Sequence, residues 1–311
     1  MATIADQFYY LDGYIKETFD VELDKGTDYI PMLFGVEKSD RSIENYLGLN
    51  AVDNMVKWNG SVAYDTVSQG YRVQVPYEKF SRGLNLEKEL FLAKNYKDVK
   101  DKVNDLALAS YRSMQMSAGN VFDNAFSYDA ENLITADGKA LCASDHPKAS
   151  DNAETIDNAG TLALTPKNVD TVMNEMIDWE DSKGNPINVM PDCLIVGTKQ
   201  LRNAKKVVGS EKEPFDANNG INVYSDGSLK VLYNPFIREN VWFLADSRKM
   251  HNMMKWINFF YNKPFLDNDS DFDTEIGSGT EKLLLERVRR KSFVHSINPK
   301  NVRLTCGHTK L

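Results

Sequence analysis

The 311-residue sequence has few cysteines, no long apolar run and no excess of positive charge. Its cysteines, Cys142, Cys193 and Cys306, are odd in number and widely spaced, so we expect free thiols in a reducing compartment rather than a disulfide framework. No stretch reaches the roughly 18–20 apolar residues that a membrane-spanning helix needs, so no membrane contact is expected. Acidic residues outnumber basic ones by 45 to 37, giving a formal charge of −8, which disfavours tight binding of nucleic acid.

The sequence also lacks a complete set of catalytic or metal-binding residues. The segment LITADGKALCASDHP, residues 133–147, places Cys142 four residues before His146. A thiolate nucleophile needs a base positioned in space and usually a third, orienting group, whereas a structural zinc ion needs about four ligands. The other histidines and cysteines are isolated along the chain. We therefore expect a turn in which His146 hydrogen-bonds the backbone, with no catalytic residue, metal ion or cofactor.

Four further segments resemble binding motifs only superficially. The glycine-bearing turns at 208–213 and 225–228 match neither the P-loop nor the dinucleotide fingerprint. The acidic segment at 267–275 lacks the glycine and glutamate of a calcium-binding loop. The basic run ERVRRKS at 286–292 lies in a predicted strand. Because the chain is acidic overall, this run favours ion pairing with a neighbouring subunit over contact with nucleic acid.

The first half of the chain predicts a hairpin that needs a partner surface. Residues 62–66 and 71–77 each show apolar side chains at alternate positions, on either side of a glycine-containing turn at 68–70. An isolated two-stranded ribbon is only marginally stable, so we expect this hairpin to pack on another surface, in the same chain or in a neighbour. Residues 1–50 read as irregular or weakly helical, and their aromatic side chains leave the same two options open.

A long helix is predicted next. Apolar residues recur at three- and four-residue steps from Leu86 to Ala118, with one irregularity, and Gly119 is the expected end of the helix. A helix of about 33 residues is about 50 Å long, which suits an elongated subunit better than a sphere. A helix broken into two pieces is the alternative.

The second half alternates between strands and helices. Residues 128–165 read as a long loop, after which Thr165 and Pro166 supply the cap and first position of a helix. A buried strand at 193–196, a second short helix and two further strands follow, which predicts a mixed α/β unit from about 120 to 250. One more strand region is expected near the end of the chain.

The order of four segments along the chain indicates a protein family. They are the hairpin and long helix, the segment ADGKALCASDHP at 136–147, a strand pair with an N-x-Y…W-x-L-A pattern at 222–246, and the closing segment RVRRKSFVHSINPKNV at 287–302. Together they resemble the major capsid proteins of tailed bacteriophages with the Hong Kong 97-type fold, in particular the Mu-like major head subunit family. The resemblance covers the chain from about residue 50 to its end.

The resemblance implies an α+β fold with a definite division of the chain. Residues 1–50 would form an N-terminal arm, 51–84 an extended β-hairpin loop and 85–126 the spine helix of a peripheral domain. Residues 127–249 would form an axial domain, and 250–311 the C-terminal strands of the peripheral domain.

The resemblance also implies a structural role without enzyme activity. The chain would assemble with itself into pentamers and hexamers of an icosahedral shell around a double-stranded DNA genome, in the virion, after assembly in the host cytoplasm. Separate scaffolding, portal and decoration proteins would be its partners, the DNA contact would be weak and non-specific, and no lysine–asparagine crosslink is expected. The residues expected to contact neighbouring subunits are Phe8, Tyr9, Tyr14, Tyr64, Tyr71, Arg72, Arg82, Arg287, Arg289 and Arg290.

Two other functions stay open at this point. One is an encapsulin-like shell protein of a bacterial nanocompartment, which would share the fold. The other is a cytosolic α/β enzyme that uses Cys142 and His146.

Overall fold

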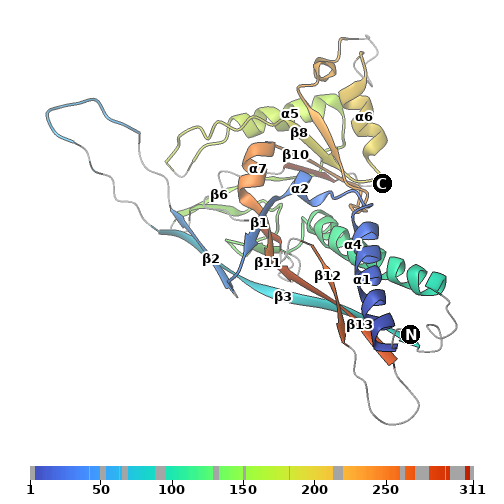
Figure 1. The fold of residues 1–311 in the computed structure, drawn as a ribbon. Helices are drawn as coiled ribbons and strands as arrows, with labels where there is room; N and C mark the ends of the chain where they lie inside the picture. Colours follow the sequence, from blue (N-terminus) through green and yellow to red (C-terminus); the bar gives the residue numbers. More distant parts are fainter. Residues whose placement is uncertain are drawn as a thin grey trace.

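Two β-sheets organise the chain, and helices lie along each of them (Figure 1). The computed structural model describes residues 4–41, 43–49, 54–62, 64, 69–87, 96–128, 133–149, 152–181, 183–212, 220–259, 263–269, 280–290, 292–294 and 305–308. Within these residues an eight-stranded sheet and a five-stranded sheet are accompanied by a separate two-stranded ribbon. The expected α+β class is confirmed.

The eight-stranded sheet is assembled from distant parts of the chain. Its path runs β2-β3-β13-β11-β14-β4, with β1 added on β11 and β12 added on β13. Its strands are β1 (Gly35–Ser39), β2 (Ile43–Leu49), β3 (Gln69–Glu87), β4 (Leu133–Thr135), β11 (Met254–Phe259), β12 (Phe265–Asp269), β13 (Thr280–Arg290) and β14 (Ser292–Val294). The antiparallel pairing of β3 with the whole of β13 therefore joins the first third of the chain to its end.

The predicted hairpin has a different partner strand. Residues 71–77 do form a strand, but they belong to the long β3, whose first half pairs with β2 in antiparallel fashion. Val62 and Tyr64 lie outside any strand, and residues 65–68 lie outside the described part of the chain. The predicted pairing of 62–66 with 71–77 is therefore wrong. Local alternation identified the strand, but it could not identify the more distant segment that completes the hydrogen bonds.

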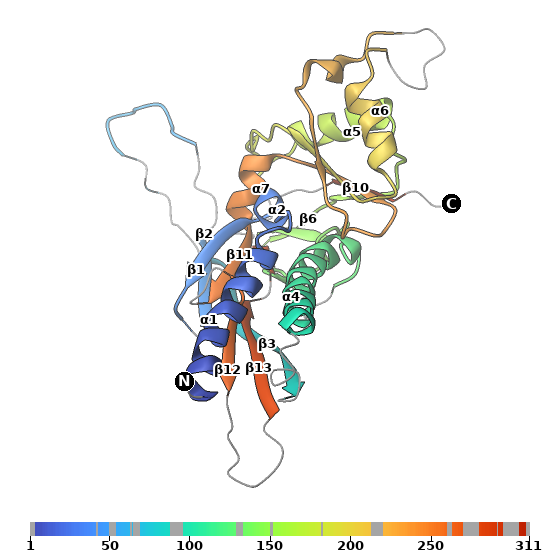
Figure 2. The same cartoon turned by 45° about the vertical axis from the view of Figure 1, so that its right-hand side comes forward.

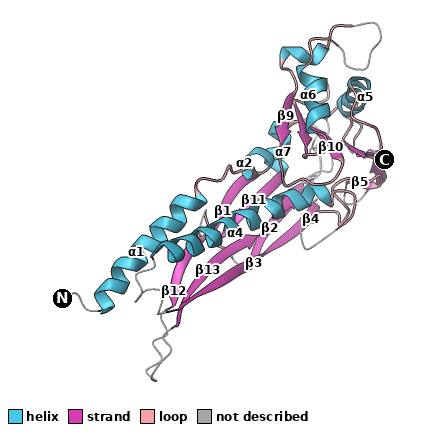
Figure 3. Cartoon of the chain, turned by 90° about the vertical axis from the view of Figure 1, so that its right-hand side faces the viewer, coloured by secondary structure: helices cyan, strands magenta, loops and turns pink. Residues whose placement is uncertain are grey.

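Two helices lie side by side along the eight-stranded sheet, as Figure 3 shows. They are α1 (Ile4–Leu23) and α4 (Tyr96–Asp123). Ile15 and Phe19 of α1 are buried together with Val99 and Val103 of α4, because these residues form the apolar stripe of each helix. The last turns of α1 thus pack on the chain's own core. Of the two options for residues 1–50, packing in the same chain therefore holds for this part.

The long helix exists, but its limits differ from the prediction. α4 has 28 residues and begins at Tyr96, whereas Leu86 lies in β3. Gly119 does not end the helix: it is buried within α4, and a Cβ atom there would lie 2.4 Å from the carbonyl oxygen of Phe236. The glycine is needed for this close approach of two backbones rather than for helix termination.

The five-stranded sheet has the order β7-β15-β10-β8-β9. Its strands are β7 (Ala159–Gly160), β8 (Cys193–Val196), β9 (Lys230–Tyr233), β10 (Val241–Ala245) and β15 (Thr305–His308). α5 (Pro166–Ile177) and α6 (Leu201–Gly209) pack on one face of this sheet, and the end of α4 packs on the other. β15 comes from residues 250–311, so this region contributes to both sheets.

In the second half of the chain, the predicted start of the first helix is confirmed, whereas several short strands were not predicted. The side chain of Thr165 accepts a hydrogen bond from the backbone N–H of Asn168, and Pro166 opens α5, as predicted. Residues 128–165, expected as a loop, instead contain four short strands. The remaining elements are α2 (Ile30–Leu33), β5 (His146–Ala149), β6 (Asn152–Ile156), the 3₁₀ turn η1 (Val223–Asp226) and α7 (Ser247–Met253). Every helix in the described residues is too short or too polar to cross a membrane.

Candidate functional site

The segment around Cys142 and His146 forms a closed loop that is held by hydrogen bonds. Nδ1 of His146 lies 2.5 Å from Oδ2 of Asp137, and the other oxygen of this carboxylate accepts a hydrogen bond of 3.1 Å from the backbone N–H of Lys139. The side chain of Asp137 is 4% exposed. The expected hydrogen bond from His146 to the backbone is therefore replaced by one to a buried carboxylate. Sequence spacing could not show this, because Asp137 is brought close by the folding of the loop.

Cys142 is not available as a nucleophile. Its sulfur is part of a disulfide bond, so the expectation of three free thiols is wrong at this position. Cysteine spacing carries no information about which segments the fold brings together, so the disulfide bond could not be predicted from it. Cys193 is a free and buried thiol in β8, where burial raises its pKa and keeps it protonated. Neither sulfur is suited to catalysis.

The carboxylate of Asp137 is held in its charged form. Burial alone would raise its pKa, but the hydrogen bond and the charge of His146, together with backbone N–H groups, outweigh burial and place the pKa of Asp137 below its ordinary value. Because the folded pKa is depressed, the stabilisation is present above the pKa of the unfolded chain, about 3.9, and is lost as the pH falls below it.

Asp137→Asn is expected to lower the free energy of unfolding by about 1–3 kcal/mol at pH 7. The neutral amide loses the hydrogen bond that the charged carboxylate forms with the imidazole of His146. Urea unfolding of the variant and the parent at pH 7 and pH 3 measures the difference, which should shrink at the lower pH. Asp145→Asn is the matched control, since Asp145 is exposed and pairs with Lys139 at the surface. An equal difference at both pH values would contradict the assignment.

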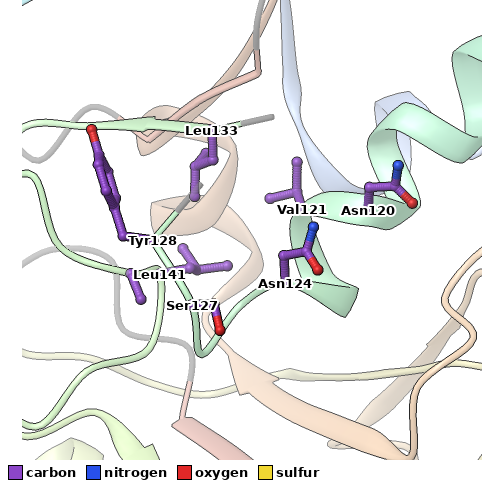
Figure 4. A pocket seen from close by; sticks show the side chains of 8 residues that line it. Asn120, Val121, Asn124, Ser127, Tyr128, Leu133 and Leu141 are labelled. Atoms are coloured by element: carbon purple, nitrogen blue, oxygen red, sulfur yellow. The ribbon is translucent and has the colours of Figure 1, made fainter. Parts of the chain in front are cut away.

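A small hollow beside this hydrogen-bonded loop is lined by residues that are not suited to catalysis. It lies between the end of α4 and the segment 133–141, and Figure 4 shows Asn120 and Asn124 on one side and Tyr128 and Leu133 on the other. The described lining contains no carboxylate, imidazole or thiol, so it offers no general base or nucleophile. Among the described residues, no group of three or more possible metal ligands occurs either.

The feature that demands a function is instead a segment that stands away from both sheets. Residues 54–62, between β2 and β3, project from the body of the molecule in both Figure 1 and Figure 2. Trp58 is 69% exposed and Met55 is fully exposed, and Val56, Val62 and Tyr64 are also largely exposed. At the base of the segment Asn54 donates a hydrogen bond to Asn185. Apolar side chains gathered on a protruding segment are typical of a surface that another chain covers.

The expected contact residues are spread over several elements. Tyr64 is largely exposed and follows the projecting segment, whereas Tyr71 is half-buried in β3, beside the exposed Arg72. Arg82 is also exposed on β3, and Tyr14 is exposed on α1. Phe8 and Tyr9 lie on α1, and Arg287, Arg289 and Arg290 lie on β13, with side chains outside the described residues. The expectation that these ten residues contact neighbouring subunits stays a prediction.

Trp58, Met55 and Val56 were missed by the sequence reading. Their signal was present: three large apolar residues within the short stretch NMVKWNG, bounded by asparagines and a glycine and without a partner strand.

A known protein family matches the larger part of the chain. The sequence profile of a family described as phage capsid protein matches residues 98–281, which is more than half of the 311 residues. The match runs from the first turn of α4 to the beginning of β13. No curated protein sequence is significantly similar to the chain.

Several solved structures share the fold. A chain of Mycobacterium phage Adephagia is 9% identical, with a TM-score of 0.51 over 92% of this chain and 91% of that one. A chain of the procapsid of bacteriophage JBD30 is 16% identical, with a TM-score of 0.52 over 76% of this chain and 100% of that one. The capsid of the same phage gives 13% identity and a TM-score of 0.52, over 68% and 91%. At such low identities the likeness shows the arrangement of elements and no more.

Proposed function

Because this chain belongs to the phage capsid protein family, we propose that copies of it assemble into the pentamers and hexamers of an icosahedral head around double-stranded DNA. Its role is that of a structural major capsid protein, and its fold is the Hong Kong 97-like capsid fold. The family is not known for enzyme activity. The observation that carries the assembly proposal is the projecting segment 54–62, whose apolar side chains are exposed to solvent in the isolated subunit.

The physical argument for self-assembly rests on unsatisfied burial. A large apolar side chain that moves from water into a contact contributes about 1.5–3 kcal/mol, so Trp58 and its neighbours gain only when another surface covers them. The segment stands away from its own subunit, which leaves a neighbouring copy as the natural partner. We assign the eight-stranded sheet with α1 and α4 to a peripheral domain, and the five-stranded sheet with α5 and α6 to an axial domain.

The finer parts of the proposal have support of different kinds. Assignment to the Mu-like branch of capsid proteins rests on the D-G-x-x-L…H-P segment at 136–147, whose Asp137 and His146 form the buried pair. Weak, non-specific contact with DNA agrees with the formal charge of −8. Separate scaffolding, portal and decoration proteins are proposed as partners, with assembly in the host cytoplasm.

The two other functions are less favoured. An encapsulin-like shell would share the fold, but the matching family is one of phage capsid proteins. An enzyme using Cys142 and His146 would need a free thiolate, whereas Cys142 is in a disulfide bond.

Expression of the chain alone and together with candidate scaffolding proteins tests the proposal. We expect closed particles by negative-stain electron microscopy, and a fast-sedimenting species that contains this chain. A species that stays monomeric at high concentration under every combination would contradict the assembly proposal.

A further inference from the structure

The two helices of the axial domain lie at opposite sides of one helical layer. Val169 of α5 and Val207 of α6 are buried in the same core, against the same face of the five-stranded sheet. α5 contacts β10, whereas α6 contacts β8 and the edge strand β9. In Figure 1, α6 stands at the right of this layer and α5 extends to its left. Each helix therefore presents a flank that faces away from the other one.

The flank of α6 is positively charged, and acids among the described residues compensate this charge only weakly. Lys199, Arg202 and Lys205 follow each other at three-residue steps, all are exposed, and no acidic residue occurs from 193 to 210. Among the described residues, the side chains of Arg202 and Lys205 contact no acid, and Lys199 reaches Glu239 only at 3.9 Å. Like charges at this spacing repel, and cations near a helix N-terminus meet the positive end of its dipole. The subunit alone gains nothing from this arrangement.

The end of α5 shows the opposite imbalance. Glu175 lies in the last turn and Asp178 is the C-cap residue, and both are exposed. The last turn contains no basic residue, and neither carboxylate forms an ion pair within the described part of the chain. Acidic groups at a helix C-terminus meet the negative end of the dipole, which is again unfavourable. A cationic surface placed here would relieve both the repulsion between the acids and the dipole.

We propose that the α6 flank of one subunit docks on the C-terminal end of α5 in the next subunit around a capsomer, so that Arg202 and Lys205 face Glu175 and Asp178. This inference rests on the proposed capsid function, since it needs a ring of copies. Two different patches on opposite sides of a subunit make a head-to-tail contact, and such contacts form a ring when the rotation between neighbours closes. The ion pairs would fix the register between neighbours and speed their encounter.

A second copy fits these patches better than DNA does. Nucleic acid would satisfy the cations of α6 but would leave the acids of α5 exposed to further negative charge. A neighbouring copy satisfies both patches, since Arg202 and Lys205 meet Glu175 and Asp178. The chain's own formal charge of −8 also means that acidic partners are abundant among copies of itself.

Charge reversal tests the pairing. R202E/K205E and E175K/D178K are each expected to lower the particle yield about tenfold, because weak pairs repeated around every ring are replaced by repulsion. Combining all four substitutions is expected to restore the yield to within about threefold of the parent, since the same pairs form with reversed sign. K97E/K100E on α4 is the control for net charge and is expected to assemble normally. Unfolding temperatures of the soluble subunits should not fall in any variant, since the reversed charges meet the ends of the helix dipoles favourably.

A crosslink separates contact between subunits from effects within one. Copies carrying R202C and copies carrying E175C, produced together, are expected to give a dimer band on a non-reducing gel that neither variant gives alone. Normal particles from both charge-reversed variants, or no recovery in the combined variant, would overturn the pairing while the capsid function stands. Duplex DNA binding that R202E/K205E abolishes, with assembly intact, would assign the α6 flank to DNA instead. If the parent itself forms no particles under any condition, the proposed function and this inference both fail.

Discussion

Replacing Val56 and Trp58 by serine is expected to abolish shell assembly and to leave the unfolding temperature of the soluble subunit unchanged. In the subunit both side chains are about two-thirds exposed, so their removal takes nothing from its core. In the shell they are expected to be covered by a neighbouring copy. Tryptophan is among the residues that most often dominate contacts between proteins, because it combines a large apolar area with few rotatable bonds.

The expected loss is large because the contact repeats. Each subunit would lose about 1.5–3 kcal/mol for each apolar side chain that it no longer buries. A closed shell contains the same contact between every pair of neighbours, so a modest loss for each contact becomes a failure of the whole assembly. The soluble variant should then accumulate as folded subunits or small oligomers.

Sedimentation and negative-stain microscopy of the expressed variant measure this outcome, and thermal unfolding monitors the fold. Leu108→Ser is the matched control, because Leu108 is a single exposed apolar residue on α4 without apolar neighbours that project with it. Particles in normal amounts from the double variant would show that the projecting segment has another role.

The sequence identified elements where the signal is local. The cap formed by Thr165 and Pro166, the buried strand 193–196 and most of α4 depend on residues that are neighbours in the chain. The strand partners could not be identified in this way. β3 pairs with β2 and β13, which lie on either side of it at very different distances along the chain, so no alternation within 62–77 contains this information.

The same distinction applies to the candidate site. The order of four segments along the chain, of which 136–147 is one, indicated the family, because that pattern is linear. The pairing of Asp137 with His146 depends on how the loop closes in space. The disulfide bond of Cys142 depends on which distant segment the fold brings beside it. The exposed stretch around Trp58 could be found in the sequence only as an apolar cluster without a partner. Its meaning depends on the three-dimensional fact that the chain leaves it uncovered.

A cluster of aromatic side chains joins the two sheets through the end of α4. Phe122 on α4 is fully buried, with ring centroids 6.0 Å from Phe34, which follows α2, and 5.3 Å from Phe243 on β10. Phe34 in turn lies 5.9 Å from Trp256 on β11. The rings meet edge to face or tilted, which is the favourable geometry for aromatic pairs. Phe122 thus connects the five-stranded sheet to the eight-stranded one.

Phe122→Ala is expected to lower the free energy of unfolding by about 3–5 kcal/mol, because it removes a fully buried ring and leaves a cavity between elements that cannot close up. Total stabilities of domains are about 5–15 kcal/mol, so a large share of the subunit's stability would be lost. Urea unfolding of the soluble subunit measures the change. Phe122→Leu retains most of the volume and should cost clearly less, whereas Tyr96→Ala at the exposed start of α4 should change stability by less than about 0.5 kcal/mol. A loss below about 1 kcal/mol for the alanine variant would mean that the two sheets are held together by other contacts, since a rigid aromatic junction cannot lose its central ring without a measurable cost.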